Sequence, residues 1–154
     1  MNLTSVGGVG MDSSFGFAAG DFTILVAYRS NATNLGGRRL IQGQVNNWLI
    51  GPYGDQPRVF SGAFVQVFYP TLSPMVIAWR HNGGSGIAEA YVNGVLSARR
   101  SAAVGYPGDI ALGARGAFNE PAGCRLFAYA AYSRYLTPDE IWGISKGWVN
   151  KYSF

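Results

Sequence analysis

The residues that could supply acid–base chemistry are few, and their spacing does not pair them. The chain of 154 residues has three glutamates, Glu89, Glu120 and Glu140. A glycosidase needs two carboxyl groups on opposite sides of the scissile bond, and the sequence encodes no such pair locally. Glu89, between two alanines, is expected to be a solvated residue on the face of a strand, and Glu120 lies in a turn-like segment. We therefore expect no hydrolase activity and no enzyme.

The single histidine and the single cysteine do not indicate a metal site or a catalytic triad. A zinc site of the usual type needs several Cys or His ligands, and only His81 and Cys124 are present. Ser85 stands in a glycine-rich segment, but Ile87 occupies the place of the second glycine of a nucleophile elbow. One cysteine can form no intrachain disulfide. We interpret Cys124 as a small buried hydrophobic residue and His81 as an ordinary loop residue.

Charge is sparse for a folded protein. Lysine and arginine number 12 and aspartate and glutamate 8, a net charge of +4, so that only 13% of residues are charged. A typical domain carries about 25%. Hydrophobic residues make up 48% of the chain, which excludes a disordered tail. Part of the surface is therefore expected to be apolar and to face other chains.

The basic residues are mostly arginine, and they are not clustered. Only two of the twelve are lysines, and arginine is the basic residue that protein–protein interfaces favour. The doublets Arg38-Arg39 and Arg99-Arg100 do not form the basic stripe that binds nucleic acid. We expect no nucleic-acid partner, and these four arginines are our interface candidates.

The ends and the hydropathy of the chain give no targeting signal. The first ten residues, MNLTSVGGVG, lack a basic segment followed by an apolar run, so we predict no signal peptide. No apolar stretch approaches the roughly 18 residues of a membrane helix. We expect a soluble protein with no membrane partner, made in a reducing compartment.

Short apolar runs separated by glycine, proline, asparagine and serine predict an all-β chain. In segment 75–80 both alternating faces are apolar, so this strand should be covered on both sides. Many short strands are typical of an antiparallel β-sandwich or jelly roll. The predicted strands are 22–29, 39–42, 47–50, 58–60, 64–69, 75–80, 86–92, 96–102, 109–112 and 124–132.

One hairpin is predicted with a specific turn. Asn93-Gly94, between two hydrophobic runs, suits the positive φ angles of a type I′ turn. The glycine-rich segment 82–86 indicates a second tight connection just before it. Three consecutive antiparallel strands should therefore form a meander.

One helix is predicted, at about residues 138–150. Thr137 and Glu140 have the spacing of a capping box, with proline at the first helical position. Ile141, Ile144 and Trp148, joined by Tyr152 further on, form an apolar stripe at helical spacing. We expect this helix to pack on the edge of the sandwich.

Four motifs follow one another in an order known from one superfamily. They are FTILVAYR at 22–29, YVNG at 91–94, GDIALG at 108–113 and LTPDEI at 136–141. Their order, over about residues 13–150, resembles a LamG-like jelly roll of the concanavalin A-like lectin/glucanase superfamily. The closing strand departs from the family pattern. In the family an acidic residue often follows an Arg-Ile pair in this strand, whereas this chain has LFA at 126–128.

The resemblance implies one LamG-like domain over residues 1–154. Enzymatic members of the superfamily carry paired carboxylates as E-x-D-x-x-E, which this chain lacks. Some LamG-like domains bind calcium at a loop rim, and Asp55 and Asp109 are the candidates here. Calcium takes six to eight oxygen ligands, and the five aspartates are scattered, so we expect no bound cofactor.

Aromatic residues near turns suggest a platform for sugars. The glycan-binding candidates are Trp48, Tyr53, Tyr69 and Tyr106. The alternative for the tryptophans is a structural role in the core and at the seam between helix and sheet. That alternative covers Trp48, Trp79, Trp142 and Trp148.

Two functions remain open. The first is a non-enzymatic structural or interaction protein, a virion-associated subunit in capsid decoration, collar or tail that contacts other virion or assembly proteins and itself. A phage-encoded chain of this kind would be located in the virion. The alternative is a carbohydrate-binding, lectin-like module that recognises a cell-surface glycan.

Overall fold

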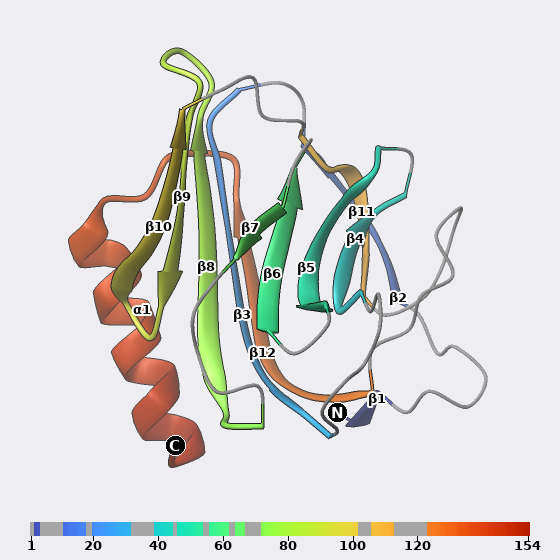
Figure 1. Ribbon diagram of the computed structural model, residues 1–154, viewed down its shortest axis with the longest axis vertical. Helices are drawn as coiled ribbons and strands as arrows, with labels where there is room; N and C mark the ends of the chain where they lie inside the picture. Colours follow the sequence, from blue (N-terminus) through green and yellow to red (C-terminus); the bar gives the residue numbers. More distant parts are fainter. Residues whose placement is uncertain are drawn as a thin grey trace.

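The computed structural model shows an antiparallel β-sandwich with one C-terminal helix (Figure 1). It therefore confirms the predicted fold class. The residues that it describes are 2–3, 11–17, 20–31, 39–44, 46–53, 56–61, 64–66, 72–101, 106–112 and 123–154.

Each sheet has six strands within these described residues. The first sheet runs, in spatial order, β1 (Asn2–Leu3), β12 (Cys124–Tyr132), β3 (Phe22–Ser30), β8 (Met75–Asn82), β9 (Ile87–Val92) and β10 (Val95–Ser101). The second runs β2 (Met11–Phe17), β11 (Gly108–Leu112), β4 (Ile41–Gly43), β5 (Trp48–Tyr53), β6 (Gln56–Ser61) and β7 (Phe64–Gln66). The two central strands of the first sheet, β3 and β8, are buried on both faces, as the sequence predicts for 75–80.

The main core lies between the sheets. Phe22, Trp48 and Trp79 are among its largest side chains, and all three are fully buried. A smaller apolar cluster covers the other face of the first sheet, where Leu25 and Ala78 pack with Ile141 of the helix. Alternate residues of one strand thus enter two different apolar layers, because successive side chains of a strand point to opposite faces.

The β8–β9–β10 meander forms as predicted. Asn93 and Gly94 have φ angles of 50° and 87°, the positive values of a tight primed turn. The Asn93 side chain accepts a hydrogen bond of 2.8 Å from the amide of Val76, and the Asn93 amide donates one of 2.8 Å back to the Val76 carbonyl. The turn is therefore fastened to β8 as well as closing the hairpin.

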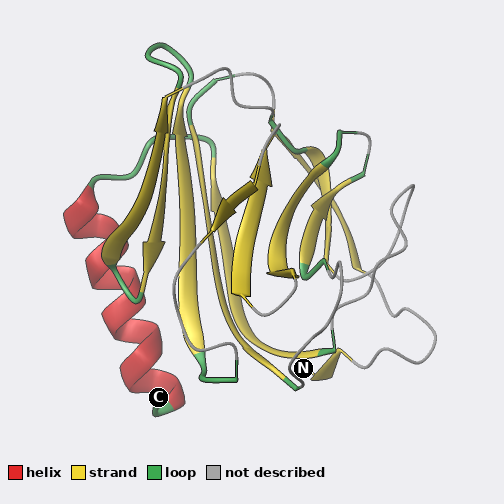
Figure 2. Cartoon of the chain, viewed as in Figure 1, coloured by secondary structure: helices red, strands yellow, loops and turns green. Residues whose placement is uncertain are grey.

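The helix α1 (Pro138–Tyr152) begins at the predicted capping box. The Thr137 hydroxyl accepts from the amide of Glu140, and the Glu140 carboxylate accepts from the amide of Thr137. Its expected place on the edge of the sandwich is wrong. Figure 2 shows α1 alongside the first sheet, and its buried Ile141 contacts the outer face of that sheet. The reason is that outward-facing apolar residues of β3 and β8 need a cover.

Two strands were not predicted, β1 and β2. Segment 11–17, MDSSFGF, is rich in small and polar residues, so its pattern lacks the β-branched residues that mark a strand. Pairing with β11 makes it a strand. In the part of the chain described, we find no helix with the length and hydrophobicity needed to cross a membrane.

Candidate interaction surface

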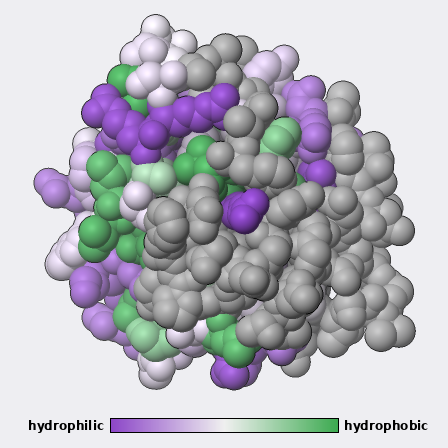
Figure 3. All heavy atoms as spheres, in the orientation of Figure 1, coloured by the Kyte–Doolittle hydropathy of each residue, from purple (hydrophilic) through white to green (hydrophobic). Residues whose placement is uncertain are grey.

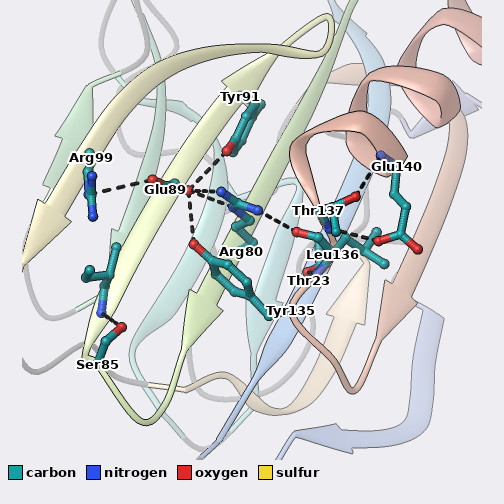
Figure 4. A network of polar contacts seen from close by, with 11 residues as sticks. Thr23, Arg80, Ser85, Glu89, Tyr91, Arg99, Tyr135, Leu136, Thr137 and Glu140 are labelled. Carbon is teal, nitrogen blue, oxygen red and sulfur yellow. Dashed lines mark hydrogen bonds and ion pairs between the residues drawn. The ribbon is translucent and has the colours of Figure 1, made fainter.

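A buried ion pair joins neighbouring strands on the outer face of the first sheet. Arg80 of β8 lies opposite Glu89 of β9 in the register, and the two residues are only 6% and 5% exposed. Two nitrogens of the Arg80 guanidinium contact the same carboxylate oxygen, Oε2 of Glu89, and the Nε–Oε2 distance is 2.6 Å (Figure 4).

Two tyrosines complete this pair. The hydroxyls of Tyr91 and Tyr135 each donate to Oε2 of Glu89 at 3.0 Å. The Arg80 guanidinium lies 5.1 Å from the centre of the Tyr91 ring and 4.1 Å from that of Tyr135, within cation–π distance. Arg80 also donates to the carbonyl of Leu136 at 2.5 Å. We call Arg80, Glu89, Tyr91 and Tyr135 the polar network.

The polar network keeps its carboxylate charged. Burial alone would raise the pKa of Glu89, but hydrogen bonds from Arg80, Tyr91 and Tyr135 outweigh burial and lower it. A carboxyl group that acts as a general acid needs a raised pKa. The network therefore suits a structural role: it ties Tyr135 and Leu136, which precede α1, to the sheet. Our expectation of Glu89 as a solvated residue is wrong, because Arg80 and two tyrosines satisfy it in a buried position.

The arginine candidates have different environments. Arg99 is exposed and lies 3.6 Å from Oε1 of Glu89. Arg100 donates to the carbonyl of Ser61 at 3.2 Å, which links the two sheets. Arg39 is only 6% exposed and donates to the Asn47 side chain at 2.9 Å, so its expected place at an interface is wrong. Arg38 lies outside the described residues.

Of the four glycan candidates, the structure describes the side chains of two, Trp48 and Tyr106. Trp48 is fully buried, with its ring 6.4 Å from that of Phe22. No face of Trp48 is open to a sugar, so this prediction is wrong and the core alternative is confirmed. Tyr53 belongs to β5, but its side chain lies outside the description, as does the whole of Tyr69. Tyr106 is 39% exposed.

Two polar residues lie close to Tyr106 in the structure or in the sequence. The side-chain amide of Asn46 donates to the Tyr106 carbonyl at 3.1 Å, and Asp109, exposed, follows at the start of β11. We call Asn46, Tyr106 and Asp109 the loop rim. Asp55, the other calcium candidate, lies outside the described residues. Among those that are described, no three His, Cys, Asp or Glu side chains group in a way that could hold a metal ion.

Three large apolar side chains are exposed around the β9–β10 turn. Val95 is 66% exposed, Leu96 49% and Trp142 of α1 52%. A Cβ on Gly94 would come within 2.9 Å of the Trp142 Cα, so the turn lies directly against this part of the helix. We call Val95, Leu96 and Trp142 the apolar patch. Figure 3 shows hydrophobic surface on the side of the molecule where β10 and α1 lie.

The apolar patch was missed by sequence reasoning. The alternative of a role in the core or at the seam between helix and sheet included Trp142, but Trp142 is 52% exposed. A signal was available, because Ile141 begins the buried stripe and the next residue of a helix is rotated by about 100° away from it. The exposure of Val95 and Leu96 could not be predicted, because the alternation of apolar and polar residues does not indicate which strand lies at the edge of a sheet.

The single cysteine and the single histidine are both structural. Cys124 is fully buried, as predicted, and burial raises the pKa of its thiol to about 12, although a hydrogen bond with Ser30 opposes the rise. His81 lies in β8, not in a loop as expected, and is 6% exposed. Its Nδ1 is 3.0 Å from the Gly20 carbonyl.

Comparison with known proteins supports the fold and gives no family. No family model and no curated protein match the chain. The binding domain of Paraclostridial Mosquitocidal Protein 1 is similar in structure, with a TM-score of 0.71, 18% identity, and coverage of 97% of this chain and 43% of that chain. A proposed carbohydrate-binding protein from Bacteroides ovatus has a TM-score of 0.66 and 16% identity over 92% of this chain and 47% of its own.

A third similar structure is that of botulinum neurotoxin type C, whose cell entry depends on two ganglioside molecules. Its TM-score is 0.63 and its identity 13%, over 84% of this chain and 36% of that one. The chain thus spans less than half the length of each of these proteins. At such low identities the likeness shows a shared fold, and a fold alone does not assign a function.

Proposed function

We propose that the chain is a non-enzymatic binding module that acts through protein–protein contacts within an assembly. The apolar patch is the observation that carries this proposal. Exposed large apolar side chains close to one another are typical of surfaces that contact other proteins, and tryptophan is enriched among residues that dominate binding energy.

The proposed assembly is a virion, with this LamG-like jelly roll as a subunit of capsid decoration, collar or tail. Support comes from the surface: the charged residues are few, and one carboxylate and its arginine are buried in the polar network. Few charged residues are then left on the surface, where they would favour contact with water over contact with another protein. An exterior of this composition suits contact with other subunits.

Co-purification tests this proposal. The tagged chain is co-expressed with the products of the genes that flank its own gene, and the complexes are quantified. We expect a flanking capsid or tail protein to co-purify with the wild type and to be lost from the Val95→Ser/Leu96→Ser variant. Tyr106→Ala, which removes an exposed aromatic side chain just before β11 of the second sheet, is the control and should retain the partner. Equal recovery with both variants contradicts a role for the apolar patch.

Carbohydrate binding is the second candidate, and the loop rim is the observation that favours it. Tyr106 is exposed, the Asn46 side chain is held at its backbone carbonyl, and the exposed Asp109 follows three residues later. An exposed aromatic ring with polar residues on the same loop can stack on a sugar and donate or accept hydrogen bonds. Proteins of similar fold include the carbohydrate-binding and ganglioside-dependent ones named above. A glycan array decides between the two candidates: binding that Tyr106→Ala abolishes and Trp142→Ala leaves intact supports the lectin-like function, and no binding at all contradicts it.

A further inference from the structure

Two exposed arginines lie directly opposite each other at one end of the first sheet. Arg29, near the end of β3, is the register partner of Arg125, near the start of β12, and both residues are exposed. Directly opposite residues of an antiparallel pair point to the same face, and like charges in such a pair destabilise the sheet. Arg29 shares the outer face with Leu25, because residues at even spacing along a strand point the same way.

Neither of these arginines has a polar partner among the residues that the structure describes. No ion pair or hydrogen bond joins Arg29 or Arg125 to any of them. Five other arginines do contact a carboxylate, a side-chain amide oxygen or a backbone carbonyl: Arg39, Arg80, Arg99, Arg100 and Arg134. Two guanidinium groups held together without a counter-charge are unfavourable for this chain alone, which indicates that the counter-charge comes from a partner.

Aromatic packing holds one of the two arginines in place. The Arg125 guanidinium lies 5.2 Å from the centre of the Phe127 ring, within cation–π distance. The Phe127 ring centre is in turn 5.6 Å from that of Tyr152 and 5.3 Å from that of Phe154. Figure 1 shows the C-terminal end of α1 at the same end of the molecule as the end of β3. Arg125 is therefore oriented before any ligand binds, which lowers the entropy cost of binding.

The geometry favours a carboxylate as the anion. A guanidinium group presents its N–H donors as a planar fork that matches the two oxygens of a carboxylate. A sugar would need an open ring face, but the Phe127 ring already contacts Arg125 and two other rings. A nucleic acid needs a longer row of basic residues. Lys151, which is exposed and lies 5.6 Å from the centre of the Tyr152 ring, adds one more positive charge at this end of α1.

We propose that Arg29 and Arg125 together bind a carboxylate of an acidic segment on a partner protein. The inference rests on the proposed function, since it names the chemistry of one partner in the assembly. It uses residues that the apolar patch does not contain. The net charge of +4 would also speed the approach of an acidic partner.

An NMR titration of the pure chain tests the site. The probe is a hexaglutamate peptide blocked at both ends, and the backbone amide shifts that it causes should centre on Arg29 and Arg125. Arg29→Gln and Arg125→Gln should each weaken the binding by about tenfold, the loss expected for a hydrogen bond to a charged group. Rising sodium chloride should also weaken it, because the charges are exposed.

Two further variants separate a built site from net charge. Arg134→Gln removes the same charge at the other end of β3, where Thr23 donates to the Arg134 carbonyl, and it should leave the binding unchanged. Arg29→Lys/Arg125→Lys keeps both charges but loses the planar forks, so its affinity should lie between those of the wild type and the glutamine variants. Equal weakening by Arg134→Gln overturns the inference.

A stability measurement separates binding from a structural role. Arg29→Glu places opposite charges across the strand pair, so it should raise the melting temperature by about 1–3 °C while it abolishes peptide binding. A fall in melting temperature would mean that Arg29 serves the fold, and it overturns the inference. So does a peptide that shifts neither arginine, or tighter binding of heparin or of a deoxythymidine oligonucleotide at the same residues.

Failure of this inference differs from failure of the proposed function. A chain that ignores the peptide yet binds a flanking gene product through the apolar patch overturns only the carboxylate site. Peptide binding at Arg29 and Arg125 by a chain that binds no assembly protein supports the site and contradicts the virion role.

Discussion

The polar network and the apolar patch each combine residues of the β8–β9–β10 meander with one residue of α1 or of the segment before it, and they reverse the usual distribution of side chains. Arg80 and Glu89 are charged, yet they are 6% and 5% exposed, whereas Val95 is 66% exposed. Soluble proteins bury charged residues only when they are paired, and they rarely group large apolar ones outside. The comparison indicates that the network serves this chain's own fold and that the patch serves another chain.

The difference follows from what covers each region. Tyr135, on the segment that leads into α1, lies over Arg80, and the Leu136 carbonyl accepts a hydrogen bond from Arg80. The buried charges of Arg80 and Glu89 therefore have partners within the chain. Beyond the β9–β10 turn, Val95 and Leu96 begin the edge strand β10, and both side chains are exposed. The predictions below test this contrast from the largest expected effect to the smallest.

Loss of the buried carboxylate should have the largest effect. Glu89→Ala leaves the Arg80 charge buried and unpaired, which should lower the free energy of unfolding by about 3–5 kcal/mol. Arg134→Ala breaks the exposed pair that Arg134 makes with Glu140 at 2.8 Å, and it should have a much smaller effect. Urea denaturation measures both variants. Equal losses would show that burial of the polar network adds nothing.

Acid should destabilise the fold by protonating carboxylates whose pKa is lowered in the folded chain. Hydrogen bonds from Arg134 and then from the Thr137 backbone lower the pKa of Glu140 from its ordinary 4.5 to about 2, and the pKa of Glu89 is also lowered. A carboxyl group with a lowered pKa stabilises the fold above its unfolded pKa and loses this contribution as pH falls through its folded pKa. Melting temperature should therefore fall between about pH 4.5 and 2.

Variants separate the contributions to this acid response. Glu140→Gln should flatten part of the fall in melting temperature, and Glu89→Gln should lower the melting temperature already at neutral pH. A wild-type melting temperature that stays constant down to about pH 2 would contradict both assignments.

Substituting two exposed glycines of α1 should raise stability, the reverse of the usual effect of a mutation. Gly143→Ala and Gly147→Ala should each raise the free energy of unfolding by about 0.5–1 kcal/mol, because alanine favours the helix and neither Cβ meets a neighbour. Thermal melts of the wild type and of each variant measure this effect. Destabilisation would mean that both glycines are needed by the chain's own packing.

Changes in the apolar patch should have the smallest effect on stability. Val95→Ser and Leu96→Ser should alter the free energy of unfolding by no more than about 0.5 kcal/mol, since both side chains already face solvent. Chemical denaturation checks the value, and the same variants should lose the assembly partner. A large loss of stability would place the patch in the fold and not in binding.

Local patterns predicted the elements of the structure well and the site poorly. The turn at Asn93-Gly94 and the cap at Thr137 depend on neighbouring residues alone, and both form as predicted. Glu89 could not be predicted, because its partners are nine residues away at Arg80 and forty-six away at Tyr135. Such partners meet only when strands pair and the segment before α1 folds back.

The sequence alone determined that this chain is an all-β sandwich poor in charge, with one capped helix. Those features depend on composition, alternation and short-range hydrogen bonds. Tertiary structure decided that α1 covers the outer face of the first sheet, that Trp48 is buried and that Trp142 is exposed. The reason is physical: alternation tells which residues share a face of a strand or helix, but only packing determines which of these faces is covered and which is left for a partner.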